Sequence, residues 1–79
     1  MKPIKYSRHA RRRMKEREIT KEEAEITINE PEFTEPGIKS RTNAFKCIGS
    51  RFLRVTFKDE PDHILVITAA MRKKPFRRQ

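Results

Sequence analysis

The chain has 79 residues, the length of one small domain. Charged residues make up 39% and hydrophobic residues 34%, a composition that predicts a thin core. The net charge of +9 predicts a surface that attracts polyanions. The longest apolar run, residues 64–71, is far shorter than the roughly 20 residues that a membrane span requires. No apolar stretch of the kind found in secretory signals follows the basic N-terminal residues. We therefore expect a cytoplasmic protein with no membrane partner.

The charges alternate in blocks along the chain. Residues 1–17 contain eight basic side chains and one Glu, whereas residues 18–35 contain seven Glu and one Lys. A basic excess returns in residues 36–57 and again in residues 64–79. Either one face of the molecule is built for phosphate, or ordinary solvated charges happen to segregate. The large excess and the preference for Arg, whose planar guanidinium binds phosphate in a bidentate manner, favour the first interpretation.

The first helix is predicted over residues 8–17, because this stretch lacks Pro, Gly and β-branched residues and follows Ser7, a good N-cap. An apolar seam recurs every four residues, formed by Tyr6, Ala10 and Met14. A second stripe at the same spacing is formed by His9, Arg13 and Arg17. These three groups project from one side of the helix and repel one another unless an anion lies between them. In a purely structural alternative, His9 ties the helix to the sheet and the two arginines pair with a Glu of the second helix, such as Glu25.

The second helix begins at a capping box, Thr20-Lys21-Glu22-Glu23, with Ile19 placed to form a hydrophobic staple. It should end near residues 29–30, because Pro31 disfavours helical geometry at the residue before it. Residues 33–42 are expected to form a connection with a type II turn at Pro36-Gly37.

The period of the apolar pattern then changes to two. Three strands of an antiparallel meander are predicted, over residues 44–48, 52–57 and 64–71. The expected fold is α+β, with two N-terminal helices packed on one face of a three- to four-stranded antiparallel sheet. The chain is expected to be a single domain over residues 1–79, with a structured core of about residues 4–73 and a basic tail at 74–79.

A three-residue hairpin loop, Gly49-Ser50-Arg51, places Ile48 opposite Phe52 and separates the side chains into two faces. The face expected to pack against the helices holds Phe45, Cys47, Leu53, Val55 and Phe57. The open face holds Lys46, Arg54 and Thr56, flanked by Ile48 and Phe52. In the last strand, the core positions are Leu65, Ile67, Ala69 and Met71, and the open positions are Ile64, Val66, Thr68 and Ala70.

These side chains provide the groups that metal-independent RNA cleavage requires. His9 can act as acid or base, several Arg and Lys side chains can stabilise the charge of the phosphorane, and Phe52 or Tyr6 can stack a base. Cys47 is the single cysteine, so an internal disulfide and a cysteine-cluster zinc site are excluded. The two histidines and the acidic residues show no metal-ligand spacing, and we expect no cofactor.

The opening motif, His9-Ala10-x-x-Arg13-Met14-x-x-Arg17-x-Ile19-Thr20, resembles the prokaryotic family of domain of unknown function 4258. Asn29-Glu30-Pro31, the hairpin of residues 49–57 and Val66-Ile67-Thr68-Ala69 extend the resemblance over roughly residues 6–73. Glu18 departs from the pattern, since the family commonly has Gly there, so the corner between the helices is expected to differ in shape. In the order of its elements, that family resembles the RelE and BrnT ribonuclease toxins of the barnase–EndoU–colicin–RelE group.

The resemblance implies an RNA-directed, toxin-like protein with metal-independent endoribonuclease activity and an acidic antitoxin as a partner. The candidate catalytic residues are His9, Arg13, Arg17, Arg54 and Thr68. The candidate nucleic-acid-binding residues are Lys46, Phe52, Thr56, Arg72, Lys73, Lys74, Arg77 and Arg78. Two alternatives remain open: a nucleic-acid-binding module without catalysis, and a protein-interaction domain that docks through the acidic helix or the sheet edge.

Overall fold

The computed structural model describes residues 2–72 and shows an α+β fold, as the sequence predicts. The elements follow the order β1 (Ile4–Tyr6), α1 (Arg8–Glu16), α2 (Lys21–Asn29), β2 (Phe33–Pro36), the 3₁₀ helix η1 (Ile38–Ser40), β3 (Arg41–Ile48), β4 (Arg51–Asp59) and β5 (Ile64–Arg72). The predicted boundaries of the domain and its tail are not tested by these elements, since the tail lies outside the described residues.

The sheet differs from the predicted antiparallel meander. Within residues 2–72 it has five strands in the order β1-β5-β4-β3-β2, and β1 runs parallel to β5 while the other neighbours are antiparallel. The expectation of a three- to four-stranded antiparallel sheet is therefore wrong. Both additional strands are short, three and four residues, so neither shows a readable alternation in the sequence. Strand β1 is stabilised by pairing with β5, which is distant in the chain, and β2 is stabilised by pairing with β3.

Both helices begin where the sequence predicts, because local side chains cap their free backbone N–H groups. The Ser7 hydroxyl accepts a hydrogen bond from the amide of Ala10 at 3.0 Å at the start of α1. At α2 the Thr20 hydroxyl accepts from the Glu23 amide at 3.1 Å, and the Glu23 carboxylate accepts from the Thr20 amide at 3.0 Å. The predicted capping box is confirmed.

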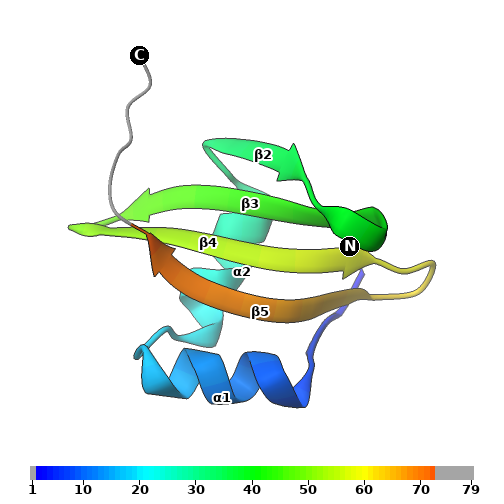
Figure 1. Cartoon of the computed structure of the whole chain (residues 1–79), viewed down its shortest axis with the longest axis horizontal. Coiled ribbons are helices and arrows are strands. Elements are labelled where there is room, and N and C mark those ends of the chain that lie inside the picture. The colour runs from blue at the N-terminus through cyan, green and yellow to red at the C-terminus, as the bar shows by residue number, and fades with distance from the viewer. Residues whose placement is uncertain (1, 73–79) are drawn as a thin grey trace.

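Figure 1 shows how the helices cover the sheet: α2 lies behind β3 and β4, and α1 lies along β5. The core between the helices and this side of the sheet consists of Ala10, Met14, Ile19, Ala24, Leu53, Val55, Val66 and Ala69. Neither α1 nor α2 covers the side of the sheet that faces the viewer in Figure 1. We call this side the helix-free face.

The β3–β4 hairpin has a two-residue loop, so the predicted three-residue loop is wrong. Ile48 pairs with Arg51, and the loop consists of Gly49 and Ser50. Gly49 has φ +62°, whereas Ser50 is not among the residues with positive φ, the combination found in a type II′ turn. The register is thus one residue away from the predicted one.

This shift moves several side chains of β3 to the other face, because directly opposite residues of a ladder share a face. Phe45 pairs with Arg54 and Cys47 pairs with Phe52, so Phe45 and Cys47 lie on the helix-free face and not in the main core. Lys46 lies on the helix side, where its Nζ donates to the carbonyl oxygen of Glu30 at 2.9 Å. Ile48, which was expected on the open face, packs against the main core.

A β-bulge corrects the prediction for the first half of β5. Thr56 pairs with Thr68 but Phe57 pairs with Val66, so Ile67 is an extra residue. Val66 is completely buried in the core, and by register Ile64 also lies on the helix side while Leu65 does not. Beyond the bulge, Ala69 and Met71 lie on the helix side and Thr68 and Ala70 on the helix-free face, as predicted.

Candidate nucleic-acid interface

Three phenylalanines from three adjacent strands form an aromatic cluster at one end of the helix-free face. The ring centroids of Phe33 and Phe45 are 4.6 Å apart with nearly parallel planes, and those of Phe45 and Phe52 are 6.0 Å apart. Phe45 and Phe52 are only 7% and 6% exposed, whereas Phe33 is 40% exposed. We use the name aromatic cluster for Phe33, Phe45 and Phe52.

Polar and cationic side chains occupy the rest of the helix-free face. Arg54 is half-buried, next to the aromatic cluster through its register with Phe45. The Thr56 hydroxyl donates to the side-chain oxygen of Asn43 at 2.6 Å, and Thr68 lies opposite Thr56 on β5. The structure therefore brings Phe52, Arg54, Thr56 and Thr68 onto one face, as predicted.

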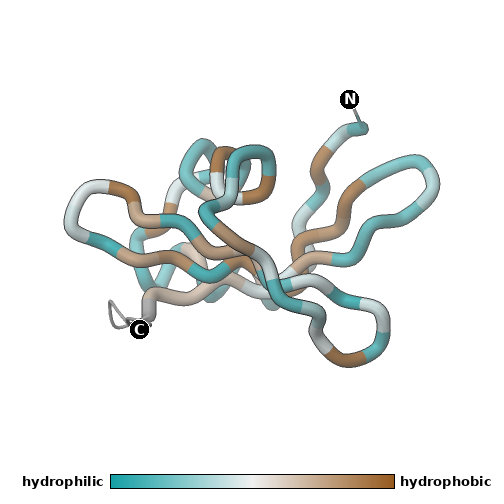
Figure 2. The backbone as a smooth tube through the Cα atoms, turned by 90° about the horizontal axis from the view of Figure 1, so that it is seen from above, coloured by the Kyte–Doolittle hydropathy of each residue, from teal (hydrophilic) through white to brown (hydrophobic). Residues whose placement is uncertain are grey.

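The connection between β2 and β3 projects on the same side as the helix-free face. In Figure 2, α2 lies at the top and this connection extends to the bottom with a hydrophobic tip. The apolar residue of this connection, Ile38, is 72% exposed. At this end of the face Arg41 pairs in register with Lys58, which adds two cations from β3 and β4.

Helix α1 is strongly basic. Of its nine residues, five are basic and one, Glu16, is acidic. The guanidinium of Arg13 lies 3.2 Å from the Glu16 carboxylate, and that of Arg17 lies 3.8 Å from it. Glu16 is thus the anion that the stripe of cations requires. Because all three side chains are partly exposed, these pairs add little stability and remain open to exchange with another anion.

The suggested partner of these arginines, Glu25, has a different role. Its carboxylate accepts a hydrogen bond from the Tyr6 hydroxyl at 3.0 Å. Burial, the hydrogen bond to Glu25 and the negative charges of Glu25 and Glu22 raise the pKa of Tyr6 well above its ordinary value. The Nζ of Lys21 lies 5.6 Å from the centre of the Tyr6 ring, which adds a contact to the same side of α2.

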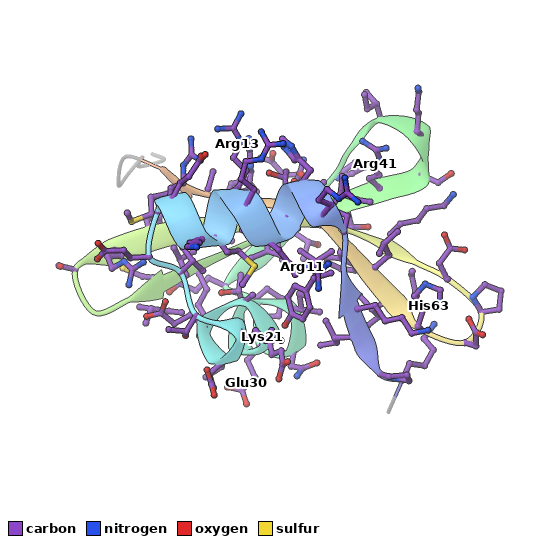
Figure 3. The ribbon with its side chains drawn as sticks, turned by 90° about the horizontal axis from the view of Figure 1, so that it is seen from below. Arg11, Arg13, Lys21, Glu30, Arg41 and His63 are labelled. Carbon is purple, nitrogen blue, oxygen red and sulfur yellow. The ribbon has the colours of Figure 1, made fainter. Side chains whose placement is uncertain are left out.

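The two sides of α1 face different parts of the molecule. Figure 3 shows Arg11 projecting on the side where α2 lies and Arg13 projecting on the opposite side. Because α2 lies behind the sheet in Figure 1, the Arg13 side is also the side of the helix-free face. Arg41 projects to this same side.

The five candidate catalytic residues divide between two elements of the fold. His9 and Arg13 lie on α1 and Arg17 is its C-cap; the side chain of His9 is exposed and makes no hydrogen bond within the described range 2–72. Arg54 and Thr68 lie on the sheet. The helix and the strands that hold these residues are therefore the predicted ones, and the catalytic roles of the residues stay predictions.

The candidate binding residues also divide. Phe52 and Thr56 lie on the helix-free face, whereas Lys46 lies on the helix side of the sheet. Arg72 is the last residue of β5 and the register partner of Phe52. The remaining candidates, Lys73, Lys74, Arg77 and Arg78, lie outside the described residues.

The sequence reasoning missed the role of Arg51, which it assigned to the hairpin loop. The guanidinium of Arg51 lies 3.1 Å from the Glu23 carboxylate and donates to the carbonyl oxygen of Glu18 at 2.7 Å. It therefore joins β4 to the corner between the helices. The signal that identifies it is the Gly49-Ser50 dipeptide, since a two-residue turn makes Arg51 the first residue of β4 and points it to the helix side.

The described part of the chain contains neither a metal-binding cluster nor a membrane-spanning helix. Between residues 2 and 72 there is no group of three or more His, Cys, Asp or Glu side chains arranged to hold a metal ion. None of the helices in this range has the length and apolarity needed to cross a membrane.

Comparisons with known proteins agree with part of the resemblance read from the sequence. No curated protein and no solved structure matches the chain, so no link to the RelE or BrnT toxins is found. Residues 6–71, most of the chain, match the family described as Domain of unknown function (DUF4258). The match includes both helices, the aromatic cluster and nearly all of β5. This chain therefore belongs to the DUF4258 family.

Proposed function

We propose that this protein binds RNA through α1 and the neighbouring helix-free face of the sheet. The observation that carries the proposal is the composition of α1, with five basic residues and one acidic residue among nine. A surface helix of this kind places guanidinium groups at spacings that suit the phosphates of a nucleic-acid strand. Phosphate oxygens replace the Glu16 carboxylate as partners of Arg13 and Arg17.

The distribution of charge gives the proposed interface a direction. Acidic residues gather on α2 and the segment that follows it, at Glu22, Glu23, Glu25, Glu30 and Glu32. These carboxylates repel a phosphate backbone from the α2 side. The helix-free face contributes Arg41, Arg54 and Lys58 instead, so the strand is expected to lie along the side of α1 that carries Arg13.

The test is the salt dependence of binding to a short, fluorescently labelled single-stranded RNA, followed by anisotropy. We expect the logarithm of the affinity to fall linearly with the logarithm of the salt concentration. Arg13→Ala should reduce that slope by about one, the effect of one lost phosphate contact. Arg11→Ala removes the same charge from the other side of α1 and should leave the slope nearly unchanged. Absence of salt-dependent binding by the wild-type protein contradicts the proposal.

A second candidate function is metal-independent endoribonuclease activity on the same surface. It is favoured by the exposed imidazole of His9, one turn before Arg13 on the same helix. His9 then acts as acid or base, the α1 arginines and Arg54 hold the scissile phosphate, and Thr68 positions it. A toxin of this kind requires an antitoxin, and an acidic partner would cover the basic side of α1.

Cleavage is tested by incubating RNA with the protein in EDTA. Products that the wild type forms and His9→Ala does not form support the second candidate. Intact RNA at high protein concentration, together with salt-dependent binding, supports binding without catalysis.

A further inference from the structure

The tip of the β2–β3 connection holds an apolar side chain out in solvent. Ile38 is 72% exposed, the highest value among the large apolar residues between positions 2 and 72. Figure 2 shows this tip as a hydrophobic end of the connection, on the side of the helix-free face. A single exposed apolar side chain is common on protein surfaces, so its significance depends on how the loop holds it and on what surrounds it.

The loop that carries Ile38 is closed at its base and strained at its tip. The Gly37 amide donates to the carbonyl oxygen of Arg41 at 2.7 Å, which closes the base. A Cβ at Gly37 would lie only 3.3 Å from that same oxygen, so this close approach favours glycine. Lys39 and Ser40 follow with φ +56° and +63°, left-handed values that cost free energy in residues other than glycine. Strain of this kind is typical of segments that contact a ligand.

Two cations lie beside this loop on the helix-free face. The Arg41 amide donates to the carbonyl oxygen of Ile38, which keeps the two residues adjacent. Arg41 and Lys58 are directly opposite each other in the β3–β4 ladder, where like charges repel. Lys58 has only a partly exposed ion pair with Glu60 at 3.7 Å, and no residue in the described range accepts a hydrogen bond from the Arg41 guanidinium. An anion bound between the two cations removes their repulsion.

We infer that Ile38, Arg41 and Lys58 form a binding site for an unpaired nucleotide, which we name the tip site. One apolar group beside two cations matches one nucleotide, whose base has an apolar face and whose phosphate is an anion. The inference rests on the proposed RNA binding and names the class of RNA, since the bases of a duplex are stacked and only unpaired bases expose their faces. Arg41 projects to the same side as Arg13 in Figure 3, so the tip site continues the proposed interface.

The test uses the full-length protein and a short single-stranded RNA that carries a fluorescent adenine analogue, whose emission rises when the base leaves the stack. Wild-type protein should raise this emission on binding. Ile38→Ser should abolish the rise and weaken binding about three- to tenfold, the effect of losing part of the burial of one aliphatic side chain. The salt slope should stay unchanged in this variant because its charge is unchanged, whereas Arg41→Ala should reduce the slope by about one. Ile26→Ser, the same change at an isoleucine of α2 that is 40% exposed, is the matched control and should affect neither emission nor affinity.

The outcomes separate this inference from the proposed function. If the wild type binds RNA in a salt-dependent manner and Ile38→Ser behaves identically, the tip site is wrong and the proposed function stands. If the wild type shows no salt-dependent binding, both are wrong. Equal affinity of the wild type for single-stranded and duplex RNA of one sequence also contradicts the inference. Binding to vesicles of anionic phospholipid that Ile38→Ser loses, together with an unchanged affinity for RNA, assigns the tip to a lipid surface and overturns the inference.

Discussion

The Arg51 guanidinium and the Glu23 carboxylate lie 3.1 Å apart and connect the first residue of β4 to the first turn of α2. Glu23 also completes the capping box with Thr20, so its carboxylate serves two partners. Arg51 in turn donates to the carbonyl oxygen of Glu18, in the corner between the helices. One side chain thus fixes the corner, the start of α2 and the end of the sheet relative to one another.

Arg51→Ala should therefore destabilise the fold by about 1.5–3 kcal/mol, the range for hydrogen bonds that involve charged groups. Both the Arg51 and the Glu23 side chains are mostly shielded from solvent, which limits screening. Guanidinium chloride unfolding measures the change. The control is Arg12→Ala, an exposed arginine on α1, whose effect should stay within about 0.5 kcal/mol. Equal effects of the two variants would show that the contact contributes nothing beyond its charge.

Gly49→Ala should lower the free energy of unfolding by about 1 kcal/mol, because Gly49 has φ +62°, where a Cβ is strained. Steric clashes do not contribute, since a Cβ at this position meets no described atom within 4 Å. Ser50→Ala tests the neighbouring position of the same turn, where φ is not positive, and should change stability only slightly. Thermal or urea unfolding of both variants distinguishes a backbone effect from a general sensitivity of the loop.

Glu18→Gly should stabilise the protein by about 0.5–1 kcal/mol. Glu18 has φ +56° at the end of α1, and relief of this left-handed strain exceeds the extra entropy that Gly gives to the unfolded chain. Its backbone carbonyl, which accepts from Arg51, is retained in the variant. Lys15→Gly inside α1 should instead destabilise by about 1 kcal/mol. A loss of stability in Glu18→Gly would mean that the Glu side chain itself holds the corner.

Tyr6 should make the protein less stable at alkaline pH. Its native pKa is raised above the ordinary value of 10.0, mainly by burial and by its hydrogen bond to Glu25. The stabilising contribution is complete below pH 10 and is lost as the pH rises toward the native pKa, because the unfolded chain ionises first. Denaturant unfolding across this range should show a steeper loss for the wild type than for Tyr6→Phe. The chain has one Tyr and no Trp, so tyrosinate absorbance follows the ionisation directly. A native Tyr6 that titrates at its ordinary pKa contradicts the prediction.

The features that the sequence determined by itself are those that depend on neighbours in the chain. Ser7 and the capping box at Thr20 fix the starts of both helices, and Pro31 fixes the end of α2. The alternation along β4 correctly placed Phe52, Arg54 and Thr56 on one face, since period two is a property of a single strand. For the same reason, the grouping of His9, Arg13 and Arg17 on α1 required only helical spacing.

Tertiary structure decided which strands pair and in what register. The two-residue turn at Gly49-Ser50 has a local signal, a glycine with φ +62°, but its consequence is tertiary, because the one-residue shift moved Phe45 and Cys47 away from the main core. The bulge at Ile67 then reversed the faces of the first half of β5. Strand β1 exists because Ile4–Tyr6 can pair in parallel with a segment some sixty residues away. Such pairings have no local signature, because the free energy that selects them comes from burying one complete face of the sheet against both helices.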